Sequence, residues 1–194
     1  MDLKNFKLIL ASGSPRRKDM FEKAGLEFEL RKNEVEEIYP EDLALQDIAE
    51  YLANLKADAL RNELADNEIL ITADTIVAFQ GKEYGKPKDR SDSIRMLTLL
   101  SNKTHEVYTG VCICDKQNKT SFTCRSVVKF AEITEEEAAW YFDNYDPSDK
   151  AGSYGIQDWV GITKVESIEG SYTNILGLPV SQTLSALKSF LENK

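Results

Sequence analysis

At 194 residues, with 42% hydrophobic and 29% charged residues, the chain has the size and composition of one soluble globular domain. Its formal net charge of -9 argues against a protein that holds long nucleic acids on a basic face, although a small anionic substrate stays compatible with it. The sequence shows no signal peptide and no stretch long enough to cross a bilayer, so we expect a cytoplasmic protein without a membrane partner.

The N-terminal third predicts a strand, a tight turn, a helix and a second strand. The apolar run Phe6–Ala11 is typical of a short strand, and glycine, serine and proline follow it at once. Ser14 can cap a helix whose first position is Pro15, and the apolar stripe of this helix ends at Gly25. A second short strand is expected at Phe28–Leu30.

Further along, hydrophobic periodicity and turn residues predict alternating helices and strands. In chain order these are a helix within Glu41–Leu64, a strand over Ile69–Phe79 interrupted at Asp74, a turn at Gly81–Lys86, a helix near Ser91–Leu100, a hairpin of Glu106–Asp115 and Ser121–Ile133, a helix over Glu135–Tyr145 with a capping box of Thr134 and Glu137, a strand near Ile162–Ile168, a loop at Gly170–Pro179 and a helix over Val180–Leu191. This order predicts an α/β fold, a mixed sheet flanked by helices.

The three cysteines favour reduced core thiols over a metal site. Cys112 and Cys114 are two apart in a predicted strand, so they share one face, and Cys124 lies in the following strand. A zinc site needs more ligands at other spacings, and His105 is the only histidine of the chain.

The segment Ser12–Arg17, SGSPRR, combines features of a phosphate-binding turn. A helix N-terminus offers free N–H groups and a partial positive charge, and two hydroxyls and two guanidinium groups accompany them here. Arginines at the second and third helical positions stand where acidic residues are usual, which often marks function. A capped helix with two solvated arginines explains the pattern about as well.

Asp74 stands between β-branched neighbours in an otherwise apolar strand, where its charge needs a cation, a metal or hydrogen bonds. The functional interpretation is a general base or metal ligand at the carboxyl edge of the sheet. The structural one is a carboxylate bonded to backbone at a bulge or strand end. Lys86, before Pro87, follows one short turn later, and the return of the chain could bring it near Asp74; a solvated turn lysine fits this pattern equally well.

The stretch Ala151–Gln157, AGSYGIQ, has two glycines around a tyrosine, which lets backbone approach a flat ligand, and Gln157 offers a donor and an acceptor to a base edge. A plain glycine-rich loop is the alternative. For the similar loop at Gly170–Pro179, a turn role suffices.

Taken together, SGSPRR, ADT, GKP, AGSYGIQ and GSYxNxxGLP occur here in the order in which they occur in the Maf family of nucleotide pyrophosphatases, which the chain resembles from Leu8 to about Pro179. The resemblance implies one Maf-like domain over residues 1–194. It also implies a fold similar to inosine-triphosphate pyrophosphatases, with an elongated mixed sheet, two lobes and a central cleft, in a protein that is commonly a homodimer.

The resemblance further implies hydrolysis of dTTP and UTP, with modified pyrimidine nucleotides open, to the monophosphate and pyrophosphate, with a divalent cation such as Mg, Mn or Co. The residues it assigns are catalytic Asp74, Lys86 and Glu37, of which Asp74 and Glu37 also hold the metal, and substrate-binding Ser12, Arg16, Arg17, Lys56, Thr75 and Gln157. The preference for dTTP and UTP is implied by three positions, Arg16, Thr75 and Gln157, that match the dTTP/UTP branch of the family; a 7-methyl-GTP branch has tryptophan, glutamine and glutamate there.

Two other functions stay open at this point. One is a pyrophosphatase for other modified nucleotides, and the other is a nucleotide-binding regulator of cell division without turnover. The acidic groups Asp74 and Glu37 argue against a pure binder, because a protein that only grips phosphates has no need of carboxylates beside them.

Overall fold

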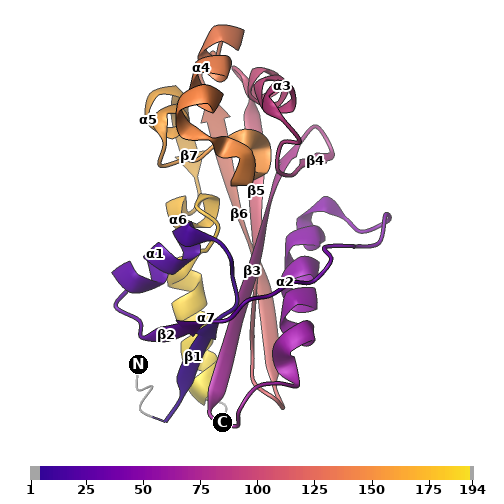
Figure 1. Cartoon of the computed structure of the whole chain (residues 1–194), viewed down its shortest axis with the longest axis vertical. Coiled ribbons are helices and arrows are strands. Elements are labelled where there is room, and N and C mark those ends of the chain that lie inside the picture. Colours follow the sequence, from indigo (N-terminus) through magenta and orange to yellow (C-terminus); the bar gives the residue numbers. More distant parts are fainter. Residues whose placement is uncertain (1–4, 193–194) are drawn as a thin grey trace. The chain divides into compact units, whose positions relative to one another are not determined.

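In the computed structural model, which describes residues 5–192, seven strands form one mixed sheet in the order β2-β1-β3-β5-β6-β7, with β4 paired to β3 (Figure 1). The strands are β1 (Lys7–Leu10), β2 (Phe28–Leu30), β3 (Glu68–Phe79), β4 (Lys82–Tyr84), β5 (Thr104–Cys114), β6 (Lys119–Phe130) and β7 (Val165–Glu169). β1 is parallel to β2 and β3, whereas β4 and β7 are antiparallel to β3 and β6. The predicted mixed sheet is therefore confirmed.

The helices are α1 (Pro15–Lys23), α2 (Leu45–Arg61), α3 (Arg90–Leu100), α4 (Glu135–Tyr145), α5 (Trp159–Lys164), α6 (Tyr172–Ile175) and α7 (Val180–Glu192), with 3-10 turns at Pro147–Asp149 and Ala151–Ser153. The capping box of α4 is present as predicted: Thr134 N–H donates to Glu137 at 3.0 Å, and Glu137 N–H donates to the Thr134 hydroxyl at 3.2 Å. Among the described residues, no helix is both long and apolar enough to cross a membrane.

The chain divides into two compact units, and each is made of separate segments. One unit contains the chain through Asp74, the segment Thr109–Cys124 and the chain from Gly177 onward; the other contains Thr75–Tyr108 and Arg125–Leu176. Because the division falls inside β3, β5 and β6, each of these long strands contributes residues to both units.

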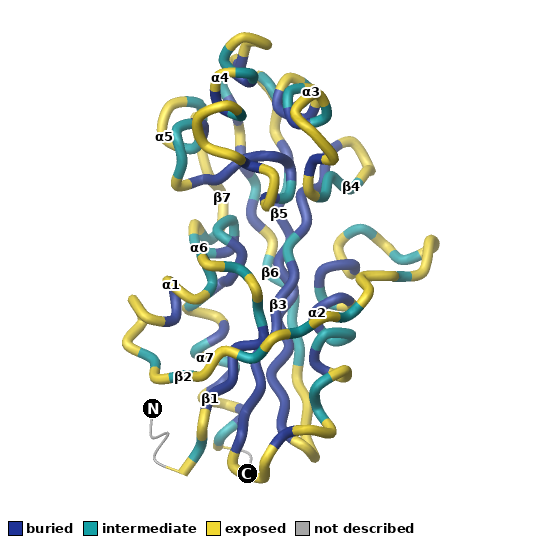
Figure 2. Tube along the Cα trace, in the orientation of Figure 1, coloured by how far each residue is buried: buried dark blue, intermediate teal, exposed yellow. Residues whose placement is uncertain are grey.

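In the first unit, helices cover both faces of the strands. On one face, Ala53 and Ala57 of α2 pack against Ile9 of β1 and Leu70 of β3, and Cys112 and Cys114 of β5 join this cluster. The thiols are free and buried on one face of the strand, as the spacing predicts. Figure 1 shows α1 and α7 on the other side of these strands, and Figure 2 shows that β3 and β5 are buried in this unit, whereas β2 is largely exposed.

The second unit has an aromatic core built around Phe130, Tyr141 and Tyr154, all of which are buried. The ring of Tyr154 packs edge-on against Phe130, with centroids 4.9 Å apart, and His105 contacts both rings in the same way. The His105 Nε2 lies 2.7 Å from the Tyr154 hydroxyl, and its Nδ1 is buried without a partner in the described part of the chain.

This burial makes the stability of the fold sensitive to pH. Desolvation lowers the pKa of His105 from 6.5 to about 4, because a protonated ring would place a charge and an unbonded N–H in the aromatic core. Between these two pH values the unfolded chain binds a proton that the folded one does not. The stabilisation is therefore present above pH 6.5 and is lost as the pH falls toward 4, by about 3 kcal/mol in total.

Urea unfolding of the wild type and of His105→Gln at pH 7 and pH 4 measures this effect. The wild type should lose about 3 kcal/mol more than the variant over the interval, because no other histidine titrates there. Equal losses in the two proteins would show that His105 titrates normally.

Several sequence predictions of local structure are wrong. Residues 162–164 belong to α5 rather than to a strand, and β7 begins only at Val165. The predicted turn after β3 contains the strand β4, joined to β3 through Gln80 and Gly81 at φ 49° and 73°, and the predicted loop at 170–179 contains α6. Ser14 occupies the N-cap of α1, but its side chain makes no capping bond.

Candidate active site

Asp74 lies within β3, just past the end of the neighbouring strand β1. The parallel β1–β3 ladder ends at the pair Leu10↔Ile71, and Asp74 follows three positions later with 8% of its surface exposed. The strand runs through Asp74 without a break, so the predicted interruption and the structural alternative of a strand end are wrong. The carboxylate stands beyond the carboxyl end of β1, which is where α/β sheets bind ligands.

Lys56 joins Asp74 to Glu37. Its ammonium forms a short ion pair with the Asp74 carboxylate and lies 2.8 Å from Glu37 Oε1. The side chains of Lys56 and Asp74 are both nearly buried, whereas that of Glu37 is 51% exposed. Two carboxylates from separate segments, the loop before α2 and the strand β3, therefore share a single cation.

Two hydrogen bonds fix the part of α2 that carries Lys56. The hydroxyl of Thr72, two residues before Asp74, donates to the Ala53 carbonyl at 2.7 Å and ties the helix to β3. The side-chain amide of Asn33 donates to the carbonyl of Lys56 itself at 2.7 Å, which holds the loop that precedes Glu37 against the helix. These bonds fix the position of the Lys56 backbone relative to the segments that carry Asp74 and Glu37.

Arg17 is fixed by a main-chain carbonyl 160 residues away. Its Nε donates to the Gly177 carbonyl at 2.7 Å, and its Nη1 donates to the Ser12 hydroxyl at 3.3 Å. The same hydroxyl accepts from Ser14 N–H at 3.2 Å. Gly177 adopts φ 109°, a conformation that residues with a Cβ rarely adopt, so glycine is needed where the carbonyl meets Arg17.

The electrostatic surroundings of Arg17 connect it with the carboxylates. Burial lowers its pKa below the ordinary value, Asp74 and Glu37 act in the opposite direction, and the neighbouring Arg16 adds to the lowering. A guanidinium remains charged in proteins even so. The structure thus gathers five of the nine predicted site residues in the first unit around one group of charges: Ser12, Arg17, Glu37, Lys56 and Asp74. Arg16, half-buried in the first turn of α1, belongs to the same unit.

The remaining three predicted residues belong to the second unit. Thr75 is half-buried and follows Asp74 directly in β3, so the two side chains point to opposite faces of the strand. β4 runs back along β3 toward Thr75, and the exposed Lys86 follows its last residue by two positions. Gln157 is exposed in the turn that precedes α5.

Sequence reasoning missed three residues that support the predicted ones. The sequence indicates only a turn role for Gly177, and it singles out neither Asn33 nor Tyr141. The GSYxNxxGLP pattern carried a signal for Gly177, since a glycine that is fixed in a motif often marks a positive φ. An asparagine in a loop and a tyrosine in an amphipathic helix carry no comparable signal.

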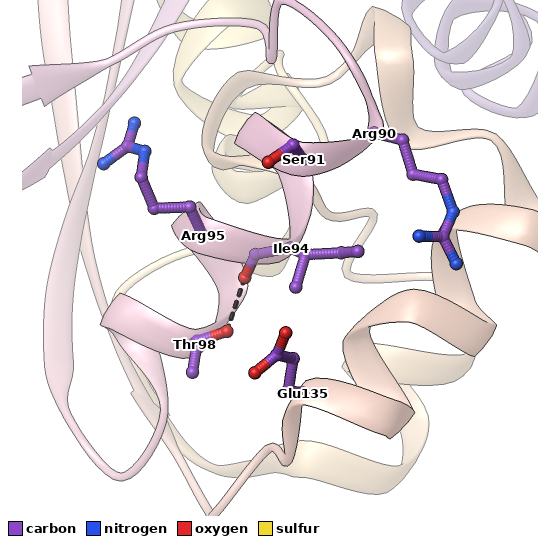
Figure 3. Close-up of a pocket in the computed structure, with 6 residues that line it drawn as sticks. All are labelled: Arg90, Ser91, Ile94, Arg95, Thr98 and Glu135. Carbon is purple, nitrogen blue, oxygen red and sulfur yellow. Dashed lines mark hydrogen bonds between the residues drawn. The ribbon is translucent and has the colours of Figure 1, made fainter.

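An open hollow in the second unit lies elsewhere. It is lined by Arg90, Ser91, Ile94, Arg95, Thr98 and Glu135, from α3 and the start of α4 (Figure 3), and by none of the predicted site residues. Its two arginines are already paired, Arg90 with Asp143 at 2.7 Å and Arg95 with Asp92 at 2.6 Å. The charges of these two arginines are therefore already balanced by neighbouring carboxylates.

Comparison with known proteins agrees with the motifs. The family model described as Maf-like protein matches residues 7–190. A protein of Flavobacterium johnsoniae is 47% identical over 97% of both chains, one of Bacteroides thetaiotaomicron is 46% identical over 96% of this chain and 97% of its own, and one of Porphyromonas gingivalis is 43% identical over 99% and 98%. Each of these relatives is named dTTP/UTP pyrophosphatase.

Among solved structures, the Staphylococcus aureus Ham1 protein aligns with 64% of this chain and 72% of its own, at a TM-score of 0.48 and 16% identity, a likeness too small to establish a shared fold. The family model and the three relatives, in contrast, span nearly the whole chain. On this evidence the chain belongs to the family of Maf-like proteins.

Proposed function

We propose that the protein hydrolyses dTTP and UTP to the nucleoside monophosphate and pyrophosphate. The observation that carries the proposal is the buried Asp74 carboxylate, which shares the Lys56 ammonium with Glu37. The charge of Arg17 interacts with both carboxylates. The names of the relatives support the substrate and the reaction, since they cover nearly the full length of this chain.

In this proposal the basic groups bind the triphosphate. Arg17 donates from Nε to Gly177 and from Nη1 to Ser12, which fixes the guanidinium in one orientation and leaves its charge to act on phosphate oxygens. The Ser12 hydroxyl accepts two hydrogen bonds, so its own proton is free to be donated to an oxygen of the substrate. Lys86 adds a further positive charge, a role that rests on the resemblance.

Asp74 is the proposed general base for the attacking water. A carboxylate needs to be ionised, oriented and shielded from bulk solvent to accept a proton from water at the α-phosphorus. Asp74 is nearly buried, which shields it from bulk solvent, and the ammonium ion of Lys56 orients it. Glu37, half-exposed at the same ammonium, lies at the open side of the pair.

We also propose a divalent cation, Mg, Mn or Co, held by Asp74 and Glu37. Both carboxylates reach one ammonium, so both can reach one metal ion, and Mg²⁺ commonly binds one or two carboxylates with phosphates and waters completing its shell. Among residues 5–192, no group of three or more His, Cys, Asp and Glu side chains that could hold a metal ion is found. When bound, such a cation neutralises charge that develops on the phosphates.

Base selection is assigned to Arg16, Thr75 and Gln157. An amide and a hydroxyl offer both donors and acceptors to the edge of a pyrimidine, and an arginine adds donors only. The proposed compartment is the cytoplasm, where the three free thiols would stay reduced. The proposed assembly is a homodimer, and this proposal rests on the resemblance alone.

The test is product analysis with the purified full chain. With Mg²⁺ or Mn²⁺ present, dTTP should yield dTMP and pyrophosphate, and dTTP and UTP should be used better than dCTP, dITP, XTP or 7-methyl-GTP. Chromatography of the nucleotide products and a coupled pyrophosphate assay measure both points. Formation of dTDP and phosphate would contradict cleavage after the α-phosphate, and no release from any nucleotide would leave a binding protein without turnover.

A further inference from the structure

Gln157 stands in a tight turn that is closed on itself. The turn runs from Gly155 to Asp158, and the Asp158 N–H donates to the Gly155 carbonyl at 3.0 Å. Gln157 is the third residue of the four, and its side chain is exposed while the residues before it are buried. The position of its amide therefore depends on how firmly the two ends of the turn are held.

Tyr141 of α4 holds both ends with one hydroxyl group. The Tyr141 hydroxyl donates to Asp158 Oδ2 at 3.0 Å and accepts from the Gly155 N–H at 3.0 Å. Tyr141 is fully buried, and its ring stacks against those of Tyr145 and Trp159, with centroids 5.3 and 6.5 Å away. The hydroxyl that holds both ends of the turn thus belongs to a side chain in the core of the second unit.

The side chain of Asp158 bonds to Tyr141 and does not cap its own helix. It occupies the N-cap of α5, where an aspartate normally accepts a hydrogen bond from the first turn of its own helix, yet no side-chain capping bond is made. Its carboxylate turns instead to Tyr141, and the ammonium of Lys150 lies 3.9 Å from the same oxygen. The local preference of an N-cap aspartate is thus not fulfilled, and the side chain bonds to the turn's partner instead.

Gly155 provides the space that this arrangement needs. A Cβ on Gly155 would stand 2.3 Å from the Asp158 carboxylate oxygen and 2.8 Å from Nε2 of Gln157. The amide of Gln157 thus lies against the backbone of Gly155, the residue whose N–H the Tyr141 hydroxyl accepts. Tyr141, Gly155 and Gln157 are therefore linked by a continuous series of contacts.

We propose that Tyr141 is a positioning residue that, through Gly155 and Asp158, sets the orientation of Gln157 and with it the preference for thymine and uracil over cytosine. The inference rests on the proposed function, in which Gln157 reads the base. Thymine and uracil present an acceptor at the position where cytosine presents a donor, and an amide carries both kinds of group. An amide distinguishes the two bases only when its orientation is fixed.

The test measures kcat/KM for dTTP and for dCTP, which differ at the base edge but carry the same triphosphate. Tyr141→Phe keeps the buried ring and removes only the hydroxyl, so the dTTP/dCTP ratio should fall roughly three- to tenfold, the factor expected for lost hydrogen bonds. Asp158→Ala, which removes the other end of the contact, should lower the ratio similarly. Tyr145→Phe, a hydroxyl deletion on the same helix outside these contacts, should leave the ratio unchanged.

Gln157→Ala and the double variant Tyr141→Phe/Gln157→Ala complete the design. The single Gln157 variant should lose selectivity, and the double variant should lose no more, because Tyr141 acts through Gln157. A ratio that falls in Gln157→Ala but not in Tyr141→Phe overturns the inference alone, as does an equal fall in kcat/KM for both nucleotides. An unchanged ratio in Gln157→Ala removes Gln157 from base selection and the inference with it, whereas no turnover of dTTP by the wild type removes the proposed function as well.

Discussion

Replacement of Asp74 by asparagine is expected to lower kcat for pyrophosphate release from dTTP by about 1,000-fold, within the range typical of removing a general base. Asparagine has nearly the shape of aspartate and retains an oxygen that faces the Lys56 ammonium, but it accepts no proton from water. Initial rates of pyrophosphate release at saturating dTTP, with Mg²⁺ and with Mn²⁺, measure the effect.

Two controls separate chemistry from folding. Asp66→Asn is the same substitution at a carboxylate of the same unit whose side chain is 94% exposed, and it should keep wild-type turnover. Affinity for a dTTP analogue that resists hydrolysis should change far less than kcat in Asp74→Asn, since Ser12, Arg17 and Lys56, the groups proposed to bind the substrate, are intact. Turnover within a few-fold of wild type in Asp74→Asn would take this residue out of the reaction.

Those features of the fold that depend on neighbouring residues could be predicted from the sequence. The capping box of Thr134 and Glu137 places the start of α4 to the residue, because both hydrogen bonds of the box lie within four residues. Asp74 could also be identified as unusual, since a charge amid β-branched residues conflicts with local propensity. In each of these examples the physical cause lies within a few positions of the residue concerned.

Contacts between distant segments could not be predicted in this way. The bond from Arg17 to the Gly177 carbonyl spans 160 residues, and the ion pair of Lys56 with Asp74 joins a helix to a strand. Nothing in either local pattern shows which partner the fold will supply. The helix α5 differs from these examples, because the close contact there is local: a Cβ on Gly161 would approach the carbonyl of Ile156, five residues earlier, to 1.8 Å.

Removal of the Lys56 ammonium, which pairs with both Asp74 and Glu37, is expected to lower the free energy of unfolding. In Lys56→Met the nearly buried Asp74 loses its ammonium partner and faces Glu37 across the vacated position. Breaking a buried ion pair by removing one partner costs about 3 to 5 kcal/mol, because a charge is left uncompensated. Urea unfolding in the presence of a chelator should show this loss. Lys116→Met, which removes a partner of the exposed Asp66, should change the free energy of unfolding by less than about 1 kcal/mol.

Manganese should then restore much of the stability that Lys56→Met loses. In the wild type an incoming cation competes with the Lys56 ammonium for the two carboxylates, whereas in the variant it meets two uncompensated charges. A ligand that binds only the folded state stabilises it in proportion to the logarithm of its concentration over Kd. The melting temperature of Lys56→Met should therefore rise more steeply with Mn²⁺ than that of the wild type, and Lys56→Met/Asp74→Asn should lose this response. Equal slopes in the single variant and the wild type would show that the ammonium and the metal do not share a site.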